Sequence, residues 1–315
     1  MSDILEVQEL KKYFRVDGGS QLHAVDGVSF KIEKGQTLGV VGESGCGKST
    51  LGRVILHLIE PSGGQIFFEG KDISNPNRSM INYVRENMQI IFQDPFSSLN
   101  PRMSVSETIM EPMIIKGGIS RSDMYEKTLK LMDTVGLAQR FTNSYPHELD
   151  GGRRQRIGIA RSLALDPKFI VCDEPVSALD VSIQAQILNL LLDLQEERNL
   201  SYIFITHDLS VVKYISNNIL VMYLGQMVEL APSDELFENP AHPYTEALLS
   251  AIPVADIHVK HERLQMKGEL TSPIDPKPGC RFMARCPYAA EKCAEPQTLQ
   301  NISPDHQVSC WMKQS

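Results

Sequence analysis

Residues 42–49 constrain the fold of this chain more than any other stretch. They read GESGCGKS and fit the pattern G-x-x-x-x-G-K-[ST]. A β-like run, TLGVVG, leads into them, and STLGRVILHLI follows with helical spacing. Glycines let such a loop surround phosphate oxygens with backbone N–H groups, and the helix start adds partial positive charge. This context predicts a nucleotide phosphate site rather than a chance glycine-rich turn.

Each loop residue has an expected place around the nucleotide. Lys48 would reach the β- and γ-phosphates, and the Ser49 hydroxyl would bind Mg²⁺. Cys46 is expected to be a small filler whose thiol is reactive, because helix N-termini lower thiol pKa values. The remaining predicted ATP-binding residues of the loop are Gly42, Ser44, Gly45, Gly47 and Thr50.

Two neighbouring carboxylates complete the predicted chemistry. Asp173 ends the apolar run KFIVCD, where P-loop enzymes need a second Mg²⁺ contact. Glu174 follows at once and is positioned to polarise an attacking water. The alternative for Glu174 is a solvated carboxylate at a strand end.

Composition excludes several classes of protein. The 315 residues, 42% of them hydrophobic, predict one large domain with an appendage or two modest domains. A net charge of −8 argues against a nucleic-acid binder. The N-terminus lacks the pattern of a signal peptide, and no run approaches the roughly 18 apolar residues of a membrane span. We therefore expect a cytoplasmic protein whose membrane role, if it has one, comes through partners.

The pattern along the chain predicts an α/β protein. Strands that alternate with helices imply a parallel sheet with crossover helices. The run ILVMYLGQMVELA predicts a hairpin with Gly225 at its turn, and VSIQAQILNLLLDLQEER predicts a long amphipathic helix. We expect an ATPase domain at residues 1–252, with a helical insertion at about 103–160, and a small Cys-rich tail at residues 253–315.

The order of motifs resembles that of ABC-transporter ATPases over about residues 4–250. The phosphate loop, Gln93 at a strand end, a helical stretch, a GG-turn helix, IVCDEPVSALD and FITHD occur in that order. Two segments, NPAHPYTEALLSAIP and GELTSPIDPKPGC, resemble the ATP-binding subunits of dipeptide and oligopeptide importers. Three others, FQDPFSSLNPR, EPVSALDVSIQAQILNLL and VMYLGQMVEL, resemble the DppF/OppF type. The resemblance implies a P-loop core with an N-terminal antiparallel β-subdomain and a helical insertion.

The resemblance also implies roles for residues at matching positions. Tyr13 would stack on adenine, and His207 would contact the γ-phosphate. Gln93 would touch Mg²⁺ or water and sense the membrane subunits. Asp180 would cross the interface of an ATPase dimer.

The implied function is ATP hydrolysis that drives import of dipeptides or oligopeptides, with ATP and Mg²⁺ as cofactors. The implied partners are a D-type ATPase subunit, two membrane permeases and an extracytoplasmic peptide-binding protein, with no nucleic acid. The chain would lie on the inner face of the cell membrane. The alternatives are an importer of nickel or glutathione, a weakly catalytic regulatory subunit, and a soluble ABC ATPase outside transport.

The family's Leu-Ser-Gly-Gly-Gln turn has an unusual counterpart here. This turn binds the γ-phosphate held by the partner subunit. A perfect Ser-Gly-Gly-Gln occurs at residues 62–65, but it leads into the strand-like IFFEG. The stretch that opens a helix before the Asp173 strand is Leu149-Asp150-Gly151-Gly152-Arg153. Context therefore assigns the signature turn to residues 149–153.

Asp150 places a negative charge where a phosphate should bind. Asp caps a helix as well as Ser does, so the helix loses nothing. A carboxylate about 4 Å from a phosphate charge is repelled by about 4 kcal/mol at an effective dielectric near 20. One interpretation is a tolerated variant in which Arg153 or Arg154 neutralises Asp150. The other is a weakened ATP site on the partner.

Four of the six cysteines crowd into the tail, with spacing C-x5-C-x6-C-x16-C. In a reducing cytosol such a cluster predicts metal binding before disulfides. Similar tails in some peptide-importer ATPases carry a [4Fe–4S] cluster, mainly in the D-type subunit. Zinc and free or disulfide-linked thiols stay open as alternatives. The candidate ligands are Cys280, Cys286, Cys293 and Cys310.

Overall fold

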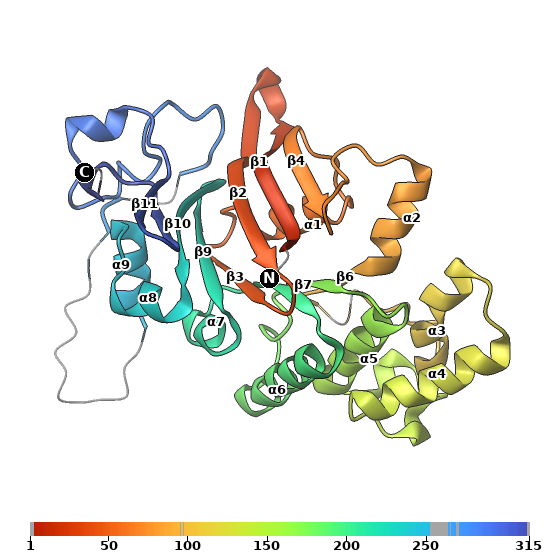
Figure 1. Cartoon of the computed structure of the whole chain (residues 1–315). Helices are drawn as coiled ribbons and strands as arrows, with labels where there is room; N and C mark the ends of the chain where they lie inside the picture. Colours follow the sequence, from red (N-terminus) through yellow and green to blue (C-terminus); the bar gives the residue numbers. More distant parts are fainter. Residues whose placement is uncertain are drawn as a thin grey trace, which may run out of the picture. The chain divides into compact units, whose positions relative to one another are not determined.

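The structure of the protein, a computed structural model, describes residues 3–94, 96, 98–252, 264, 266–268 and 271–313. These residues form two compact units, one from Met1–Asn75 with Phe204–Ser315 and the other from Pro76–Ile203 (Figure 1). The predicted domain boundary after residue 252 adjoins residues 253–263, which lie outside the described part, so it stays a prediction.

The first unit contains two sheets and the C-terminal tail. Its first part comprises β1 (Asp3–Arg15), β2 (Gln21–Glu33), β3 (Thr37–Val41), α1 (Lys48–Ile55), β4 (Gly63–Phe68) and β5 (Lys71–Asp72). Its second part comprises α7 (Leu209–Ile215), β9 (Asn218–Tyr223), β10 (Gln226–Pro232), α8 (Ser233–Glu238), α9 (Pro243–Ser250), β11 (Gln300–Ser303) and β12 (His306–Val308). Strand β8 (Ser201–Ile205) carries the chain across the division between the units.

The N-terminal strands form an antiparallel sheet in the order β2-β1-β4-β5. Around Val7, alternate residues of β1 face the core, since Leu5 and Val7 are buried while Glu6 between them is not; Ile4 is buried as well. Val7 lies opposite Phe30 of β2 and Ile66 of β4, so one buried layer crosses three strands. This period-2 pattern fixes the register, because a slip by one residue would expose the apolar face.

The second sheet of this unit has the order β11-β12-β10-β9-β3. Strands β9 and β10 form the antiparallel hairpin predicted from the sequence, and Gly225 at its turn has φ 85°. Strand β3 pairs with β9 in parallel, as expected for an α/β sheet. All five residues of β3 are buried, which is typical of a parallel strand covered on both faces.

The C-terminal tail joins this unit through backbone pairing and through one aromatic anchor. Strand β12 pairs antiparallel with β10, and β11 pairs with β12. Phe282 is 1% exposed, and its ring centroid lies 5.2 Å from that of Tyr223 and 5.3 Å from that of Tyr244. The tail therefore shares its hydrophobic core with β9 and α9.

The second unit is mainly helical. It contains α2 (Arg78–Asn87), β6 (Met88–Ile91), α3 (Val105–Lys116), α4 (Arg121–Thr134), α5 (Gly151–Leu163), β7 (Phe169–Asp173) and α6 (Val181–Arg198). Strands β6 and β7 pair in parallel, and helix α6 covers the stretch predicted from its amphipathic pattern. Ser104 and Glu107 form a capping box at the start of α3, which satisfies two backbone donors that the helix leaves unpaired. The predicted fold class is confirmed.

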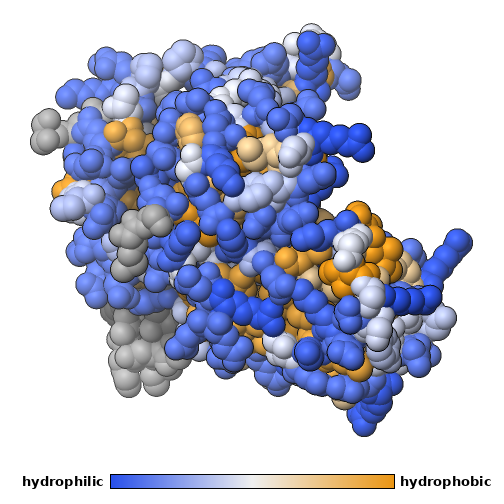
Figure 2. Space-filling view, turned by 45° about the vertical axis from the view of Figure 1, so that its right-hand side comes forward, coloured by the Kyte–Doolittle hydropathy of each residue, from blue (hydrophilic) through white to orange (hydrophobic). Residues whose placement is uncertain are grey.

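Hydrophobic residues lie at the surface of the second unit. Figure 2 shows such a region at the lower right of the view. Large exposed side chains cluster in sequence around the α3–α4 connection at Ile114, Ile115, Ile119 and Tyr125. None of the described helices is both long and apolar enough to cross a bilayer.

The buried Phe282 ring provides the first prediction. Phe282→Ala should lower the free energy of unfolding by about 3–5 kcal/mol, because the cavity left among Tyr223 and Tyr244 cannot collapse fully. Chemical denaturation measures this, with the exposed Ile302→Ala in the same tail as control. A loss below about 1 kcal/mol would show that the tail packs loosely on this unit.

Candidate nucleotide-binding site

The phosphate loop bends tightly between β3 and α1. Gly42 has φ 149° and Gly47 has φ 107°, in a region that other residues rarely adopt. A Cβ atom on Gly42 would lie 2.2 Å from the carbonyl oxygen of Met222, and one on Gly47 would lie 2.0 Å from that of Ala24. Both positions therefore need glycine for backbone conformation and for space.

Lys48 is held against the loop itself. Its side chain is buried, and Nζ donates to the carbonyl oxygens of Gly42 at 2.7 Å and Glu43 at 3.0 Å. Ser44 and Gly45 at the crest of the loop are exposed. The loop thus combines a fixed cation with accessible backbone, as the sequence pattern predicts for phosphate binding.

The surroundings of Cys46 do not favour a reactive thiol. The side chain is 2% exposed, and burial raises the pKa of its thiol even though the Lys48 ammonium opposes this. A neutral, enclosed thiol reacts slowly because the thiolate is the nucleophile. Cys46 fills space beneath the loop, and its Sγ lies 2.8 Å from where a Gly42 Cβ would be.

Tyr13, the expected adenine contact, is fixed by strand β2. Its ring stacks on His23 with centroids 4.0 Å apart, and its hydroxyl donates to Asp26. Burial and this hydrogen bond raise the pKa of Tyr13. One face of the ring is covered by His23, so adenine would have to stack on the other. Stacking of adenine on Tyr13 stays a prediction.

His207 belongs to the same unit as the phosphate loop. It is exposed and lies between the end of β8 and the start of α7. Asp208 caps that helix by accepting from the backbone N–H of Ser210 at 2.8 Å. A strand end followed by a capped helix fixes the backbone on either side of His207, and its contact with the γ-phosphate stays a prediction.

The second unit brings Gln93 and Glu174 together. Gln93 Nε2 donates to Glu174 Oε2 at 2.8 Å, which joins residues from the ends of two parallel strands. Asp173, the last residue of β7, is 1% exposed. Glu174 has φ 48°, a conformation that costs a residue with a side chain of order 1 kcal/mol. Such strain is common where a side chain must be aimed for function.

The signature turn opens α5 in the way expected for residues 149–153. Asp150 is the N-cap, and its Oδ1 accepts from the backbone N–H of Arg153 at 2.8 Å. A Cβ on Gly152 would lie 2.8 Å from a methyl group of Ile183, and one on Gly151 would lie 3.3 Å from Leu179. The turn therefore packs its glycines closely against α6 and the segment before it. By contrast, residues 63–65 lie in strand β4, so the perfect motif string opens no helix.

Comparisons with known proteins agree with this geometry. A family model described as "ABC transporter" matches residues 25–177, and one described as "Oligopeptide/dipeptide transporter, C-terminal region" matches residues 228–293. The oligopeptide transport ATP-binding protein AppF of Bacillus subtilis is 52% identical over 98% of this chain and 96% of its own length. The chain belongs to the ATP-binding subunits of the oligopeptide and dipeptide ABC transporters. OppF of Salmonella typhimurium, at 50%, and the dipeptide protein DppF of Haemophilus influenzae, at 49%, also match over 98% of the chain.

Solved structures show the same ABC fold. The protein cbiO1 of Clostridium perfringens, described as part of the ABC transporter complex cbiONQ, matches with TM-score 0.67 at 29% identity. It covers 76% of this chain and 92% of its own. A dimeric cassette, MJ0796, bound to ADP and phosphate, matches with TM-score 0.66 at 27% identity over 73% of this chain and 98% of its own. As an ABC ATPase, the chain uses ATP and Mg²⁺.

The predicted site residues are divided between the two units. The phosphate loop, Tyr13 and His207 lie in the first unit. Gln93, Asp173, Glu174, Asp180 and residues 150–153 lie in the second. Asp180 is exposed just before α6. The roles of these residues in this ABC ATPase stay predictions.

Arginines of α5 are less solvated than the helical pattern suggests. Arg154 is 6% exposed, its Nε donates to the carbonyl of Pro146 at 2.5 Å, and its guanidinium lies 3.5 Å from the Phe96 ring centroid. Arg161 donates to the carbonyl of Ser98 at 2.8 Å. Both long side chains therefore reach neighbouring segments that the helix periodicity does not reveal.

The four tail cysteines of this transporter subunit converge on one small cavity. The backbone N–H of Cys280 donates to the carbonyl of Cys293 at 2.8 Å. Burial raises the pKa of the Cys280 thiol to about 11, and the other three cysteines act in the same direction. Four thiols suit a metal, yet within the described residues no three His, Cys, Asp or Glu side chains are arranged to hold one. The predicted [4Fe–4S] cluster therefore stays a prediction that rests on the donor set alone.

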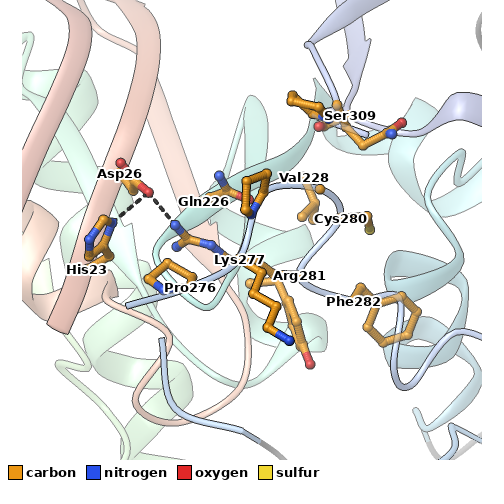
Figure 3. Close-up of a pocket in the computed structure, with 15 residues that line it drawn as sticks. His23, Asp26, Gln226, Val228, Pro276, Lys277, Cys280, Arg281, Phe282 and Ser309 are labelled. Carbon is orange, nitrogen blue, oxygen red and sulfur yellow. Dashed lines mark hydrogen bonds and ion pairs between the residues drawn. The ribbon is translucent and has the colours of Figure 1, made fainter. Parts of the chain in front are cut away.

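The sequence analysis missed Arg285. This tail residue makes a bidentate ion pair with Glu43, the second residue of the phosphate loop. Figure 3 shows a second ion pair made by the tail, between Arg281 and Asp26 of β2. It lies at the edge of a cavity of about 250 Å³. The segment CRFMARC carries an arginine before and after its buried Phe, and this spacing is the only local signal that could have pointed to the pair.

The charge of the signature turn provides the second prediction. Arg153 Nη1 lies 2.9 Å from Asp150 Oδ2, so the two charges offset each other. Arg153→Gln should weaken ATP binding about fivefold at the site that this turn faces. It leaves the charge of Asp150 uncompensated, and an exposed ion pair of this kind contributes about 1 kcal/mol. Asp150→Ser should tighten the same site.

Nucleotide titration of the two-ATPase assembly measures both effects, with this chain's own loop disabled by Lys48→Ala. Arg140→Gln, which removes a neighbouring positive charge over Phe141, is the control for general electrostatics. Unchanged affinity in both Asp150→Ser and Arg153→Gln would reduce Asp150 to a helix cap.

Proposed function

We propose that this ATPase energises the import of dipeptides or oligopeptides across the cytoplasmic membrane. The observation that supports this most strongly is a full-length match to oligopeptide and dipeptide transport ATP-binding proteins, tail included. The complete phosphate loop and the paired Gln93 and Glu174 support hydrolysis at this chain's own site rather than a purely regulatory role.

In the proposed mechanism, the loop binds the phosphates and Lys48 offsets their charge. Its ammonium would leave the carbonyls of Gly42 and Glu43 for the β- and γ-oxygens, exchanging neutral acceptors for charged ones. Ser49 and Asp173 would hold Mg²⁺, which neutralises charge that develops in phosphoryl transfer. Glu174 would orient or deprotonate the attacking water, and His207 would contact the γ-phosphate.

Gln93 would report the state of this site to the rest of the transporter. Its amide donates to one carboxylate oxygen of Glu174. A shift of the Gln93 segment would therefore move the carboxylate, and this is how a membrane subunit would gate hydrolysis. The adjacent Phe96 is 64% exposed, which suits a segment that contacts a partner.

The proposed partners are a D-type ATPase, two membrane permeases and an extracytoplasmic peptide-binding protein. The turn at Gly151 and Gly152, flanked by the exposed Asp150 and Arg153, would bind a phosphate from a second ATPase subunit, because both glycines have backbone N–H groups at a helix start. The exposed Ile114 and Ile115 near the end of α3, with the exposed Tyr125 of α4, offer apolar side chains to a permease loop. The chain would then lie on the inner face of the membrane.

A metal centre in the tail, of the [4Fe–4S] type, is a further part of the proposal. It is supported by the donor set, since four thiols line one cavity. Its role would be to fix a tail whose described residues form no regular elements beyond short strands and 3₁₀ turns. No step of ATP hydrolysis depends on it.

The third prediction tests the proposed function. Glu174→Gln in the assembled transporter should lower kcat for ATP by at least about 100-fold, because the amide cannot accept a proton from water. The affinity for ATP should change by less than about twofold, and uptake of labelled peptide should stop. Glu126→Gln, an exposed carboxylate of α4, is the control. Normal single-site turnover would reject the role of Glu174, and ATPase activity without peptide uptake would reject the substrate.

The fourth prediction tests the metal. Anaerobically purified protein should contain iron and acid-labile sulfide, with broad visible absorption that Cys286→Ser removes because one of four ligands is lost. Cys172→Ser, in buried strand β7, should leave the absorption unchanged. Zinc alone, or no metal, would reject the cluster.

A further inference from the structure

The tail contacts the phosphate loop directly through Arg285. Nη1 donates to Glu43 Oε2 at 2.5 Å and Nη2 donates to Oε1 at 3.0 Å, so both carboxylate oxygens are held by one guanidinium. The Arg285 side chain is 9% exposed and the Glu43 side chain 24%. Paired, planar contacts of this kind fix direction as well as distance, and lysine cannot reproduce them.

Glu43 is also held by its backbone. Its N–H donates to the Tyr244 hydroxyl at 2.9 Å, and its carbonyl accepts from Lys48 Nζ and from the N–H of Cys46 at 3.2 Å. The residue therefore has restraints on its side chain, its N–H and its carbonyl. Two of these come from outside the loop, one from α9 and one from the tail.

The tail is a firm support for this contact. Phe282, three residues before Arg285, is buried against Tyr244, the same tyrosine that accepts from Glu43. At the other end of the segment, Arg281 donates to Asp26 (Figure 3). It also donates to the carbonyl of Leu224. Burial would raise the pKa of Asp26, but hydrogen bonds from Tyr13 and His23 and the charge of Arg281 hold it below its ordinary value.

We propose that Arg285 is a positioning residue for ATP binding: it orients Glu43, and through it the backbone of the phosphate loop, toward the nucleotide phosphates. The inference deepens the proposed function and rests on ATP binding at residues 42–49. Arg285 does not touch the nucleotide. Glycine permits many backbone conformations, and the contact limits those available to Gly42 and Gly45. The loop therefore loses less conformational entropy when phosphate binds.

A positioning role differs from a contact that only attaches the tail. A purely structural contact would affect the stability of the protein and leave the kinetics of the folded fraction unchanged. A positioning contact changes the affinity for ATP in fully folded protein, and its effect depends on Glu43. The two therefore separate in a double-mutant cycle combined with a stability measurement.

The fifth prediction concerns the full-length ATPase, alone for nucleotide titration and assembled for turnover. Arg285→Met and Glu43→Gln should each raise the KM and Kd for ATP about tenfold, which corresponds to about 1.4 kcal/mol, with kcat changed less than about threefold. The double variant should be no weaker than either single one, because both remove the same contact. Arg285→Lys should recover only part of the affinity, since lysine restores the positive charge but cannot make the bidentate contact with the carboxylate.

The matched control is His306→Gln, which breaks a buried tail-to-body pair of 2.7 Å with Glu229 and touches no loop residue. It should lower the melting temperature and leave the KM for ATP unchanged. A KM within twofold of the original in folded Arg285→Met, additive effects in the double variant, or an equal rise in His306→Gln would each overturn the proposal.

If Arg285→Met does not fold, Glu43→Gln and Arg285→Lys decide the matter. Lys48→Ala separates this inference from the function on which it rests. Retained ATP binding in Lys48→Ala would reject the nucleotide site itself. Lost binding there, together with an unaffected KM in Glu43→Gln, would reject only the positioning role.

Discussion

Close contact between backbones at the phosphate loop is the constraint on which the rest of the first unit depends. The loop passes so near the carbonyls of Met222 and Ala24 that no side chain fits at Gly42 or Gly47. Strands β2 and β9 can therefore approach the loop this closely only because glycine occupies both positions. The backbone N–H of Gly225 also donates to the carbonyl of Cys46 at 2.8 Å. Because β10 pairs with β9 and β12 pairs with β10, the position of the tail follows from the same contact.

Local patterns were enough to predict much of this arrangement from the sequence. The hairpin at Gly225, helix α6 and the loop between β3 and α1 each depend on residues that are neighbours in the chain. Asp150 as a helix cap is likewise a property of four consecutive residues. The family follows from the order of such motifs, and the comparisons confirm it.

Contacts across long sequence separations were not predictable in this way. Glu43 and Arg285 are 242 positions apart, and no local pattern around Glu43 indicates Arg285 as its partner. The burial of Arg154 depends on Phe96 and Pro146, which belong to loops with no periodic pattern. Cys46 was expected to be reactive from its place before a helix, but enclosure by the fold decides its pKa. In each case the three-dimensional environment outweighs the local signal.

The link between Arg285 and Glu43 has a consequence for how the protein is made. The phosphate loop that this link supports is synthesised early. Arg285 leaves the ribosome much later, after most of the rest of the chain has been made. Until then, Glu43 lacks the only restraint on its carboxylate that the described residues show, and Tyr244 alone holds its N–H from outside the loop. A nascent chain would thus carry every residue of its nucleotide motifs before it carries the residue that orients them. Synthesis of the tail is then the step that completes the ATP site.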